Sequence, residues 1–299
     1  MLSAKKMRLS ASDKWFYFID YSLLIFIGLI ILLPLLHIFS QAFSDPQSVL
    51  AGRVLFWPRY FTLNTIKLIL RNPNIRTGYL NTLFYASAGT VINLAMTLMT
   101  AYPLSRSGFA GRNIFMLIFT FTMMFGGGMI PTYILIKDLG LLDTRWVMLL
   151  PGAMTVWNMI LARTFLQNTI PKEMYESADL DGASNIRILV SIVLPLSAPI
   201  IAVLTLFYAV GHWNSYFDAM MYLRSQRLFN IQLILRNAIA NISALLNQSD
   251  NLAELEKTTA YAEASKYAII VVSMVPVLII YPFVQKYFIK GIMIGAIKG

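Results

Sequence analysis

Four acidic side chains lie in one short polar segment of an otherwise apolar chain. The segment is PKEMYESADLDGASNIRILVSIVLP, residues 171–195, and the acids are Glu173, Glu176, Asp179 and Asp181. Carboxylates accept hydrogen bonds and pair with Lys or Arg, so this segment offers ion pairs to a basic surface. Pro171 suits a helix start and Gly182 suits a turn. We interpret it as a handle that a partner grips; the alternative is an ordinary amphipathic loop helix with a glycine cap.

Enzyme motifs are missing from the sequence. The chain has no cysteine and two histidines, His37 and His212, and it lacks the HExxH, GxxxxGK[ST] and GxSxG patterns. His37 is interpreted as an interfacial or helix-facing residue and His212 as a residue at the boundary of a span. We therefore expect a chain that is not an enzyme, with no metal site and no cofactor of its own.

The composition places the chain in the membrane class. Of 299 residues, 58% are hydrophobic and 13% are charged, against roughly 25% charged in soluble domains. The mean hydropathy is +0.65. The net charge of +10 is explained by basic residues that flank membrane spans, and we expect no nucleic-acid partner.

Charge-poor stretches of about 20 residues predict membrane-spanning helices. Six qualify, in an all-α fold that forms a single transmembrane domain over residues 1–299. They cover residues 21–41, 80–105, 113–136, 146–167, 188–217 and 267–285.

Basic residues in short segments predict the orientation. The N-terminal tail holds Lys5, Lys6, Arg8 and Lys14, the segment after the second span holds Arg106 and Arg112, and the C-terminal tail holds Lys286, Lys290 and Lys298. With six spans these segments share one side with residues 171–187, and we expect both termini to be cytoplasmic. The external segment 43–78 is also basic, which would suit an acidic partner or an anionic substrate. The external segment 218–266 is predicted to be a lid or a docking surface; a disordered loop is the alternative.

Polar residues within the predicted spans are candidates for a substrate pathway. Asn93, Thr97, Thr120, Thr122, Trp157 and Asn158 are of types that bind sugars by hydrogen bonds or stacking. Hydrogen bonding between helices explains them equally well. Gly126, Gly127 and Gly128 indicate either close helix packing or a break in the third span.

The chain has no evident energy source of its own. An ion-coupled secondary transporter usually keeps a carboxylate within the membrane, and none lies deep in a predicted span. Arg163, near the end of one, reaches the interface by extending its side chain. Such a transporter stays open as an alternative.

One spacing carries a resemblance to a known family. Glu176-Ser177-Ala178, three residues, Gly182, nine residues and then Ile192-Val193-Leu194-Pro195 match the E-A-A-x3-G-x9-I-x-L-P pattern of permease subunits from binding-protein-dependent ABC importers, with Ser177 in place of an alanine. Residues 285–299 resemble the end of the carbohydrate-uptake branch. Residues 79–83, 101–106 and 127–144 resemble the subgroup for complex or acidic oligosaccharides, such as alginate oligosaccharides.

The resemblance implies a role for residues 171–195 as a cytoplasmic coupling segment seated on an ATPase subunit. The residues implied are Glu176, Ser177, Ala178, Asp179, Gly182, Ile192, Leu194 and Pro195. It also implies a second, similar permease, two ATP-binding cassette subunits that carry ATP and Mg, and a periplasmic or extracytoplasmic solute-binding protein, all at a bacterial inner membrane. The expected cargo is a sugar or oligosaccharide; an importer for another solute class is the alternative.

Overall fold

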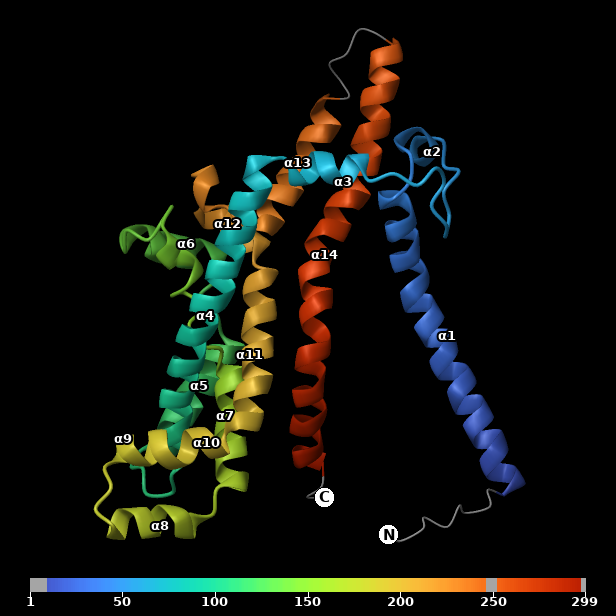
Figure 1. Ribbon diagram of the computed structural model, residues 1–299. Helices are drawn as coiled ribbons and strands as arrows, with labels where there is room; N and C mark the ends of the chain where they lie inside the picture. Colours follow the sequence, from blue (N-terminus) through green and yellow to red (C-terminus); the bar gives the residue numbers. More distant parts are fainter. Residues whose placement is uncertain (1–9, 246–251, 297–299) are drawn as a thin grey trace. The chain divides into compact units, whose positions relative to one another are not determined.

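All regular elements in the computed structural model are helices, over the residues that it describes, 10–245 and 252–296 (Figure 1). The predicted all-α fold is confirmed for this part of the chain. Lys5, Lys6, Arg8 and Lys298, which entered the orientation argument, lie outside the described residues.

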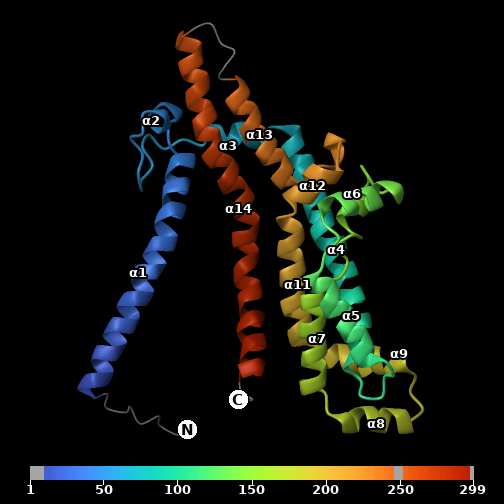
Figure 2. The same cartoon turned by 180° about the vertical axis from the view of Figure 1, so that it is seen from behind.

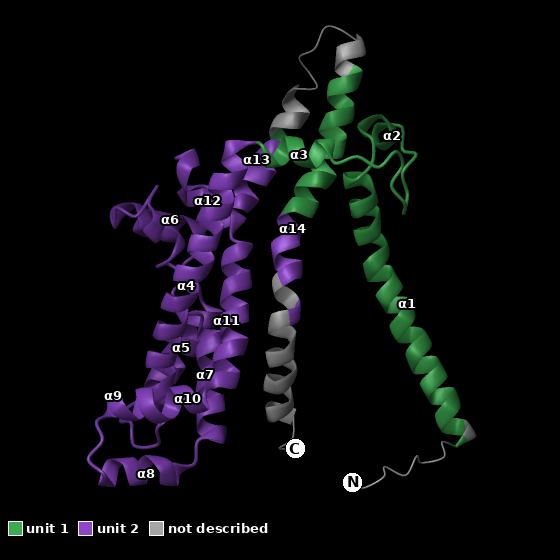
Figure 3. Cartoon of the chain, viewed as in Figure 1, with its two compact units in different colours: residues 1–71, 239–272 green, residues 72–238, 273–299 purple. Residues whose placement is uncertain are grey.

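The chain divides into two compact units (Figure 3). The first comprises residues 1–71 and 239–272, and the second comprises residues 72–238 and 273–299. The first unit holds α1 (Ala11–Ala42), α2 (Pro46–Leu50), α3 (Asn64–Leu70) and the start of α14 (Leu252–Ala296). Helix α1 begins at a capping box, in which Ser10 accepts from the backbone of the first turn and Asp13 accepts from the Ser10 N–H. Its apolar side chains are exposed over most of its length, up to Leu36, as expected of a helix that faces lipid.

Polar side chains at the end of α1 hold the loop that follows α2. The His37 Nδ1 lies 2.8 Å from the Leu55 carbonyl, and Gln41 Nε2 donates to the Val54 carbonyl at 3.0 Å. The first contact makes Nδ1 the protonated nitrogen, so Nε2 accepts from Gln41, 3.2 Å away. His37 is thus a loop anchor inside this unit.

The second unit is built on helices α4, α7 and α11, and α5 runs beside α4 and α7 (Figure 2). The bounds are α4 (Pro73–Ser105), α5 (Arg112–Met124), α6 (Met129–Asp138), η1 (Arg145–Met148), α7 (Val156–Thr169), α8 (Lys172–Leu180), α9 (Asn185–Ile188), η2 (Leu189–Val193), α10 (Leu194–Leu196), α11 (Ala198–Trp213), α12 (Tyr216–Tyr222), η3 (Gln226–Leu228) and α13 (Ile231–Leu245), whose last residues belong to the first unit. Ala101, Met159 and Leu204 are fully buried where the three main helices meet. Elements α8 to α10 lie at one end and α6 and α12 at the other, in both views (Figures 1 and 2).

Continuous helices account for only part of the predicted spans. Three described helical stretches are long and apolar enough to cross a membrane, namely Ser12–Ala42, Pro73–Ser105 and Glu256–Ile279. Two bent pairs raise the number to five if each pair is one span: α5 with α6, bent by 111°, and Asn185–Leu196 with α11, bent by 82°. The first, second and sixth predicted spans thus match unbroken helices; the others are interrupted.

The glycine triplet interrupts the third predicted span. Helix α5 ends at Met124, and Gly128 precedes α6 with φ 88° and ψ 167°, a conformation that is essentially restricted to glycine. A Cβ on Gly126 or Gly127 would meet nothing within 4 Å. The triplet therefore makes a break, and packing against the described part of this chain does not explain these two glycines.

The fourth and fifth predicted spans are interrupted for different reasons. Between η1 and α7 the backbone is irregular within predicted span 146–167, and side chains from other helices bond it: Asn93 Nδ2 donates to the Gly152 carbonyl at 2.6 Å. Irregular backbone at membrane depth is tolerated where protein groups satisfy it in this way. In the fifth span, Pro195 and Pro199 each lack the N–H that a helix would use, and the chain bends between them.

Candidate functional site

The polar segment 171–195, which we interpret as a handle, begins with helix α8 and a turn at Gly182. Pro171 is the N-cap and Lys172 is the first helical residue, so the helix begins one residue later than the proline. Glu173 lies in the first turn, where the helix dipole favours an acid. At the other end the Gly182 N–H bonds the Asp179 carbonyl at 3.1 Å, and the Ala183 N–H bonds the Ala178 carbonyl at 3.0 Å. This pair of bonds is a Schellman cap, and it requires the left-handed φ of 72° at Gly182.

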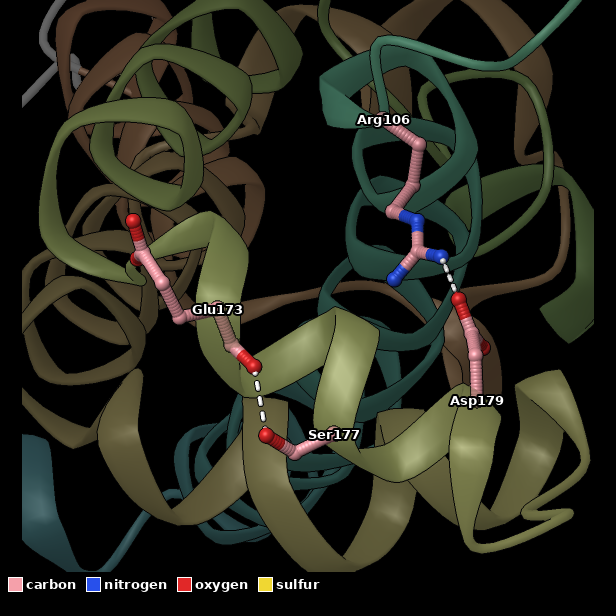
Figure 4. A network of polar contacts seen from close by, with 4 residues as sticks. All are labelled: Arg106, Glu173, Ser177 and Asp179. Atoms are coloured by element: carbon pink, nitrogen blue, oxygen red, sulfur yellow. Dashed lines mark hydrogen bonds and ion pairs between the residues drawn. The ribbon is translucent and has the colours of Figure 1, made fainter.

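One face of α8 turns toward the chain's own helices. Lys172, Tyr175, Glu176 and Asp179, spaced as one helical face, line a cavity with the α4–α5 connection. Asp179 Oδ2 lies 2.9 Å from Arg106 Nη2, as Figure 4 shows. The Arg106 guanidinium also lies over the Tyr175 ring, 4.2 Å from its centroid. Burial raises the pKa of the Tyr175 hydroxyl.

The opposite face of α8 is open. Glu173, Met174, Ser177, Leu180 and Asp181 are exposed, and Leu180 is 90% exposed. The Ser177 hydroxyl donates to the Glu173 carbonyl at 2.8 Å, so it is satisfied within its own helix (Figure 4). An exposed leucine flanked by acids and small polar groups suits contact with a protein surface that carries basic groups.

The predicted coupling residues therefore divide between these two faces and the core. Ser177 lies on the open face, Glu176 is exposed beside the cavity, and Asp179 pairs with Arg106 of the same chain. Ala178 is buried and packs with the apolar core of α4, α7 and α11. A partner that grips α8 would hence meet residues that the sequence pattern does not single out, above all Leu180.

Buried apolar side chains in the second half of segment 171–195 connect it to the core that includes α11. Ile188 and Val193 are fully buried in the same core cluster, and Ile192 packs against it. Leu194 is half-buried and Pro195 is exposed. Burial of one Ile or Val side chain contributes about 1.5–3 kcal/mol, whereas a partly exposed ion pair contributes about 0–1 kcal/mol. The core contacts therefore hold the handle in place, and the Arg106–Asp179 pair mainly orients α8.

Several predicted pathway residues are engaged with other helices. Asn93 and Thr97 are buried; Asn93 Oδ1 lies 2.7 Å from His212 Nε2, and the Thr97 hydroxyl lies 2.6 Å from that of Tyr208. The Tyr208 hydroxyl also accepts from the Thr155 N–H at 3.4 Å. Together these side chains join α4, α11 and the irregular segment before α7. For Asn93 and Thr97 this agrees with the alternative explanation, hydrogen bonding between helices.

The remaining pathway candidates differ in exposure. Thr120 and Thr122 are exposed on α5 and donate to carbonyls of their own helix. Asn158 is buried in the first turn of α7, where its backbone N–H bonds Thr155. Trp157 is 62% exposed. Of the six, Trp157 has the free aromatic face that a sugar would need.

His212 is a packing residue whose role the sequence does not reveal. Because the Asn93 amide nitrogen donates to Gly152, its oxygen accepts from His212, which places the proton on Nε2. A Cβ on Gly89 would overlap the His212 ring, so glycine is required at this helix crossing. The partners are separated by 119 residues, and no sequence pattern links them.

Hydrogen bonds hold residues 223–229 in place at the end of the second unit that lies opposite to α8. Asp143, which has φ 56°, accepts from the backbone N–H groups of Arg224 and Ser225 at 2.9 and 2.8 Å and from the Ser225 hydroxyl. These hydrogen bonds hold the pKa of Asp143 below its usual value. From the other side, Asn81 donates to the carbonyls of Arg227 and Phe229 at 2.8 and 3.0 Å. Residues 223–229 are thus fixed, with Arg224 and Arg227 exposed.

A bundle of apolar, partly broken helices with a polar helix–turn–helix across one end defines a multi-pass membrane protein. Residues 93–294 match the family described as binding-protein-dependent transport system inner membrane component. The chain belongs to this family.

Its relatives cover almost the whole chain. It is 38% identical over 288 residues to the polygalacturonan/rhamnogalacturonan transport system permease protein YtcP of Bacillus subtilis (strain 168), covering 96% of this chain and 99% of that protein. It is 28% identical to the maltodextrin transport system permease protein MdxG of the same organism, over 93% of this chain and 95% of that one. A chain in the crystal structure of a bacterial ABC transporter involved in the import of the acidic polysaccharide alginate superposes with a TM-score of 0.84 at 37% identity, covering 94% of this chain and 99% of that chain. The family resemblance read from the sequence is thereby confirmed.

Proposed function

We propose that this chain is one transmembrane subunit of an ATP-driven importer for an acidic oligosaccharide. In this proposal it forms half of the translocation pathway at a bacterial inner membrane. A second permease supplies the other half, two ATP-binding cassette subunits bind ATP and Mg, and a solute-binding protein delivers the cargo. The chain itself binds no cofactor and catalyses no reaction.

The observation that carries the proposal is the placement of α8. The helix lies across the end of the core formed by α4, α7 and α11, with Ala178 in that core and Leu180 exposed on the other side. A partner that moves α8 would therefore move the core helices through Ala178, and through the buried Ile188 and Val193 of the short helices that follow. Closure of an ATPase pair would rotate the helices between an inward-facing and an outward-facing arrangement.

The choice of an acidic cargo rests on two supports. Two of the similar proteins handle acidic polymers, since alginate is named as acidic and polygalacturonan is a polymer of a sugar acid. The end of the second unit that lies away from α8 also exposes Lys137, Arg145, Arg224 and Arg227. A basic surface concentrates an anionic cargo or an acidic carrier protein near the entrance.

Affinity purification tests the assembly. The tagged chain is extracted from membranes in mild detergent, and the proteins that accompany it are identified by mass spectrometry. We expect a second permease and an ATPase, and Leu180→Asp lowers recovery of the ATPase while leaving the second permease. A homo-oligomer without any ATPase contradicts the proposal.

Uptake by the reconstituted importer tests the cargo. Proteoliposomes that hold the whole complex and its binding protein receive oligogalacturonate, alginate oligosaccharide or a neutral maltooligosaccharide of equal length. We expect ATP-dependent uptake of an acidic oligomer and little uptake of the neutral one. Preference for the neutral oligomer refutes the acidic cargo and leaves the carbohydrate importer; uptake driven by an ion gradient without ATP refutes the whole proposal.

A further inference from the structure

A cavity of about 960 Å³ lies between α8 and the ends of α4 and α7. It is bounded by the α4–α5 connection, the end of α7 and the start of α9. One part of its wall is apolar, with Met99, Phe109 and Leu166, and another part is charged, with Arg106, Arg112 and Lys172. Such a lining fits a ligand that has an apolar part and an anionic part. We call this space the α8 cavity.

The charges of the α8 cavity are not balanced within the chain. Arg106 is paired with Asp179 at 2.9 Å. Arg112 is half-buried and Lys172 is exposed, and among the described residues neither side chain has an ion pair or a hydrogen bond. Glu176 is the one further acid in the lining. Because two unpaired cations outnumber one acid, the lining favours binding of an anion. A guanidinium binds a phosphate through two parallel hydrogen bonds.

The cavity lies at the level where membrane spans end. The candidate span Pro73–Ser105 ends directly at it, and α5, half of a bent candidate span, begins there with Arg112. Every residue of α5 is at least partly exposed, although the helix is rich in Ile, Leu and Phe. An apolar helix of this kind suits contact with lipid, and a phospholipid beside α5 would reach the rim of the cavity.

We propose that the α8 cavity binds an anionic phospholipid, such as phosphatidylglycerol. Its phosphate lies between Arg112 and Lys172, and an acyl chain lies along the apolar wall at Met99 and Leu166 and continues beside α5. Basic pockets between membrane helices bind anionic headgroups in this way. Free phosphate would satisfy the cations but would leave the apolar wall bare.

A bound lipid would join α8 to the start of α5, because Lys172 belongs to the first helix and Arg112 to the second. The lipid would then stabilise α8 in the position that the Arg106–Asp179 pair sets. An effect of the lipid on coupling to ATP hydrolysis rests on the proposed function; the binding itself does not.

Lipid retention tests the binding. The tagged chain, with whatever subunits accompany it, is purified from nanodiscs of phosphatidylcholine with a graded fraction of phosphatidylglycerol, and bound lipid is counted by native mass spectrometry. Arg112→Gln and Lys172→Gln each remove one cation, and Arg187→Gln is the matched control, since Arg187 is exposed on α9 but does not line this cavity. Met99→Trp narrows the apolar end without changing any charge.

We expect each of the two cavity variants to weaken phosphatidylglycerol retention about tenfold, Met99→Trp to weaken it as well, and Arg187→Gln to leave it unchanged. Equal retention by wild type and both cavity variants overturns the proposal. So does displacement of the lipid by millimolar inorganic phosphate or glycerol phosphate, which would identify a site for a free anion. Crosslinking of a Phe109→Cys variant to a neighbouring subunit would show a protein segment in the cavity and would also overturn it. None of these results depends on which cargo or ATPase the complex carries.

Discussion

Arg106 and Asp179 are separated by 73 residues in sequence and joined by a 2.9 Å ion pair in the structure. The pair connects the end of α4, a candidate membrane span, to the face of α8 that is turned toward the bundle. The side chains are 23% and 51% exposed, so their contribution to stability is about 0–1 kcal/mol. Their value lies in setting the rotation of α8 about its own axis.

Replacement of Arg106 by Asp should uncouple ATP hydrolysis from transport without unfolding the chain. The variant leaves the apolar anchors of α8 in place, so the melting temperature in detergent should change little. Transport per ATP hydrolysed should fall, because α8 can turn. The double variant Arg106→Asp, Asp179→Arg restores the pair with its charges exchanged and should recover the ratio. A double variant as uncoupled as the single one would show that the pair does not orient α8.

Leu180 should contribute most of the affinity for the ATPase among residues of α8. Its side chain is 90% exposed on the open face, and full burial of a leucine side chain contributes about 1.5–3 kcal/mol. Leu180→Asp should weaken ATPase binding by at least about tenfold, measured by titration of purified ATPase, while the stability of the isolated chain stays within about 0.5 kcal/mol. Leu180→Met keeps the apolar contact and should bind normally. Unchanged binding by Leu180→Asp would place the interface elsewhere.

Substitutions at Gly182 should destabilise the turn more, the less readily the new residue adopts a positive φ. A Cβ at this position meets nothing within 4 Å, so the cost comes from the backbone and not from a clash. Gly182→Ala should destabilise the turn by about 1–2 kcal/mol, Gly182→Asn by less, and the β-branched Gly182→Val by more. Hydrogen exchange of residues 172–188 measures the opening of this turn. Equal exchange in all three variants would mean that the Schellman cap is not maintained in solution.

Loss of Asn93 should destabilise the membrane core. The side chain bonds both Gly152 and His212, and each buried group left without a partner costs about 1–3 kcal/mol. Asn93→Ala should therefore lower the free energy of unfolding measured by chemical denaturation in detergent. Thr120→Ala serves as the control, because Thr120 is exposed and bonds its own helix. Normal stability of Asn93→Ala combined with weaker transport of the cargo would instead favour the substrate-pathway hypothesis for this residue.

Asp143 should make stability depend on pH at acidic values. Its pKa is lowered in the folded state by hydrogen bonds from the Ser225 hydroxyl and from the backbone of Ser225 and Arg224. A lowered folded pKa means that the stabilisation is fully present above the unfolded pKa of about 3.9 and is lost as the pH falls through the lower folded value. The difference in unfolding temperature between wild type and Asp143→Asn should be constant from neutral pH to about pH 4 and shrink below it. Asn tolerates the positive φ at this position, so the variant adds no backbone strain. A difference in unfolding temperature that grows on acidification would contradict a lowered pKa for Asp143.

Local features of the polar handle could be predicted from the sequence because they depend on neighbours within a few residues. The helix after Pro171, the acid in its first turn and the left-handed Gly182 all follow from propensities and capping. The spacing from Glu176 to Pro195 also identified the family, which the matches over residues 93–294 confirm. Apolar run length predicted the membrane class and the first, second and sixth spans.

The interruptions of the other spans depend on contacts that run length does not contain. A charge-free stretch predicts residence in lipid, but a helix there is needed only if no other group bonds the backbone. Gly152 is bonded by Asn93, and Thr155 by Tyr208, from helices far away in sequence. The stretch from 146 to 167 therefore has an irregular part although its composition is that of a span.

The sequence by itself determined that this is a helical membrane protein with a polar handle, because hydrophobicity and helix capping act locally. Only the tertiary structure decided which face of the handle is free. Asp179 and Leu180 are adjacent in sequence, yet one pairs with Arg106 and the other is exposed. Successive residues on a helix point about 100° apart, and the burial of Ala178, Ile188 and Val193 fixes which of those directions meets the core.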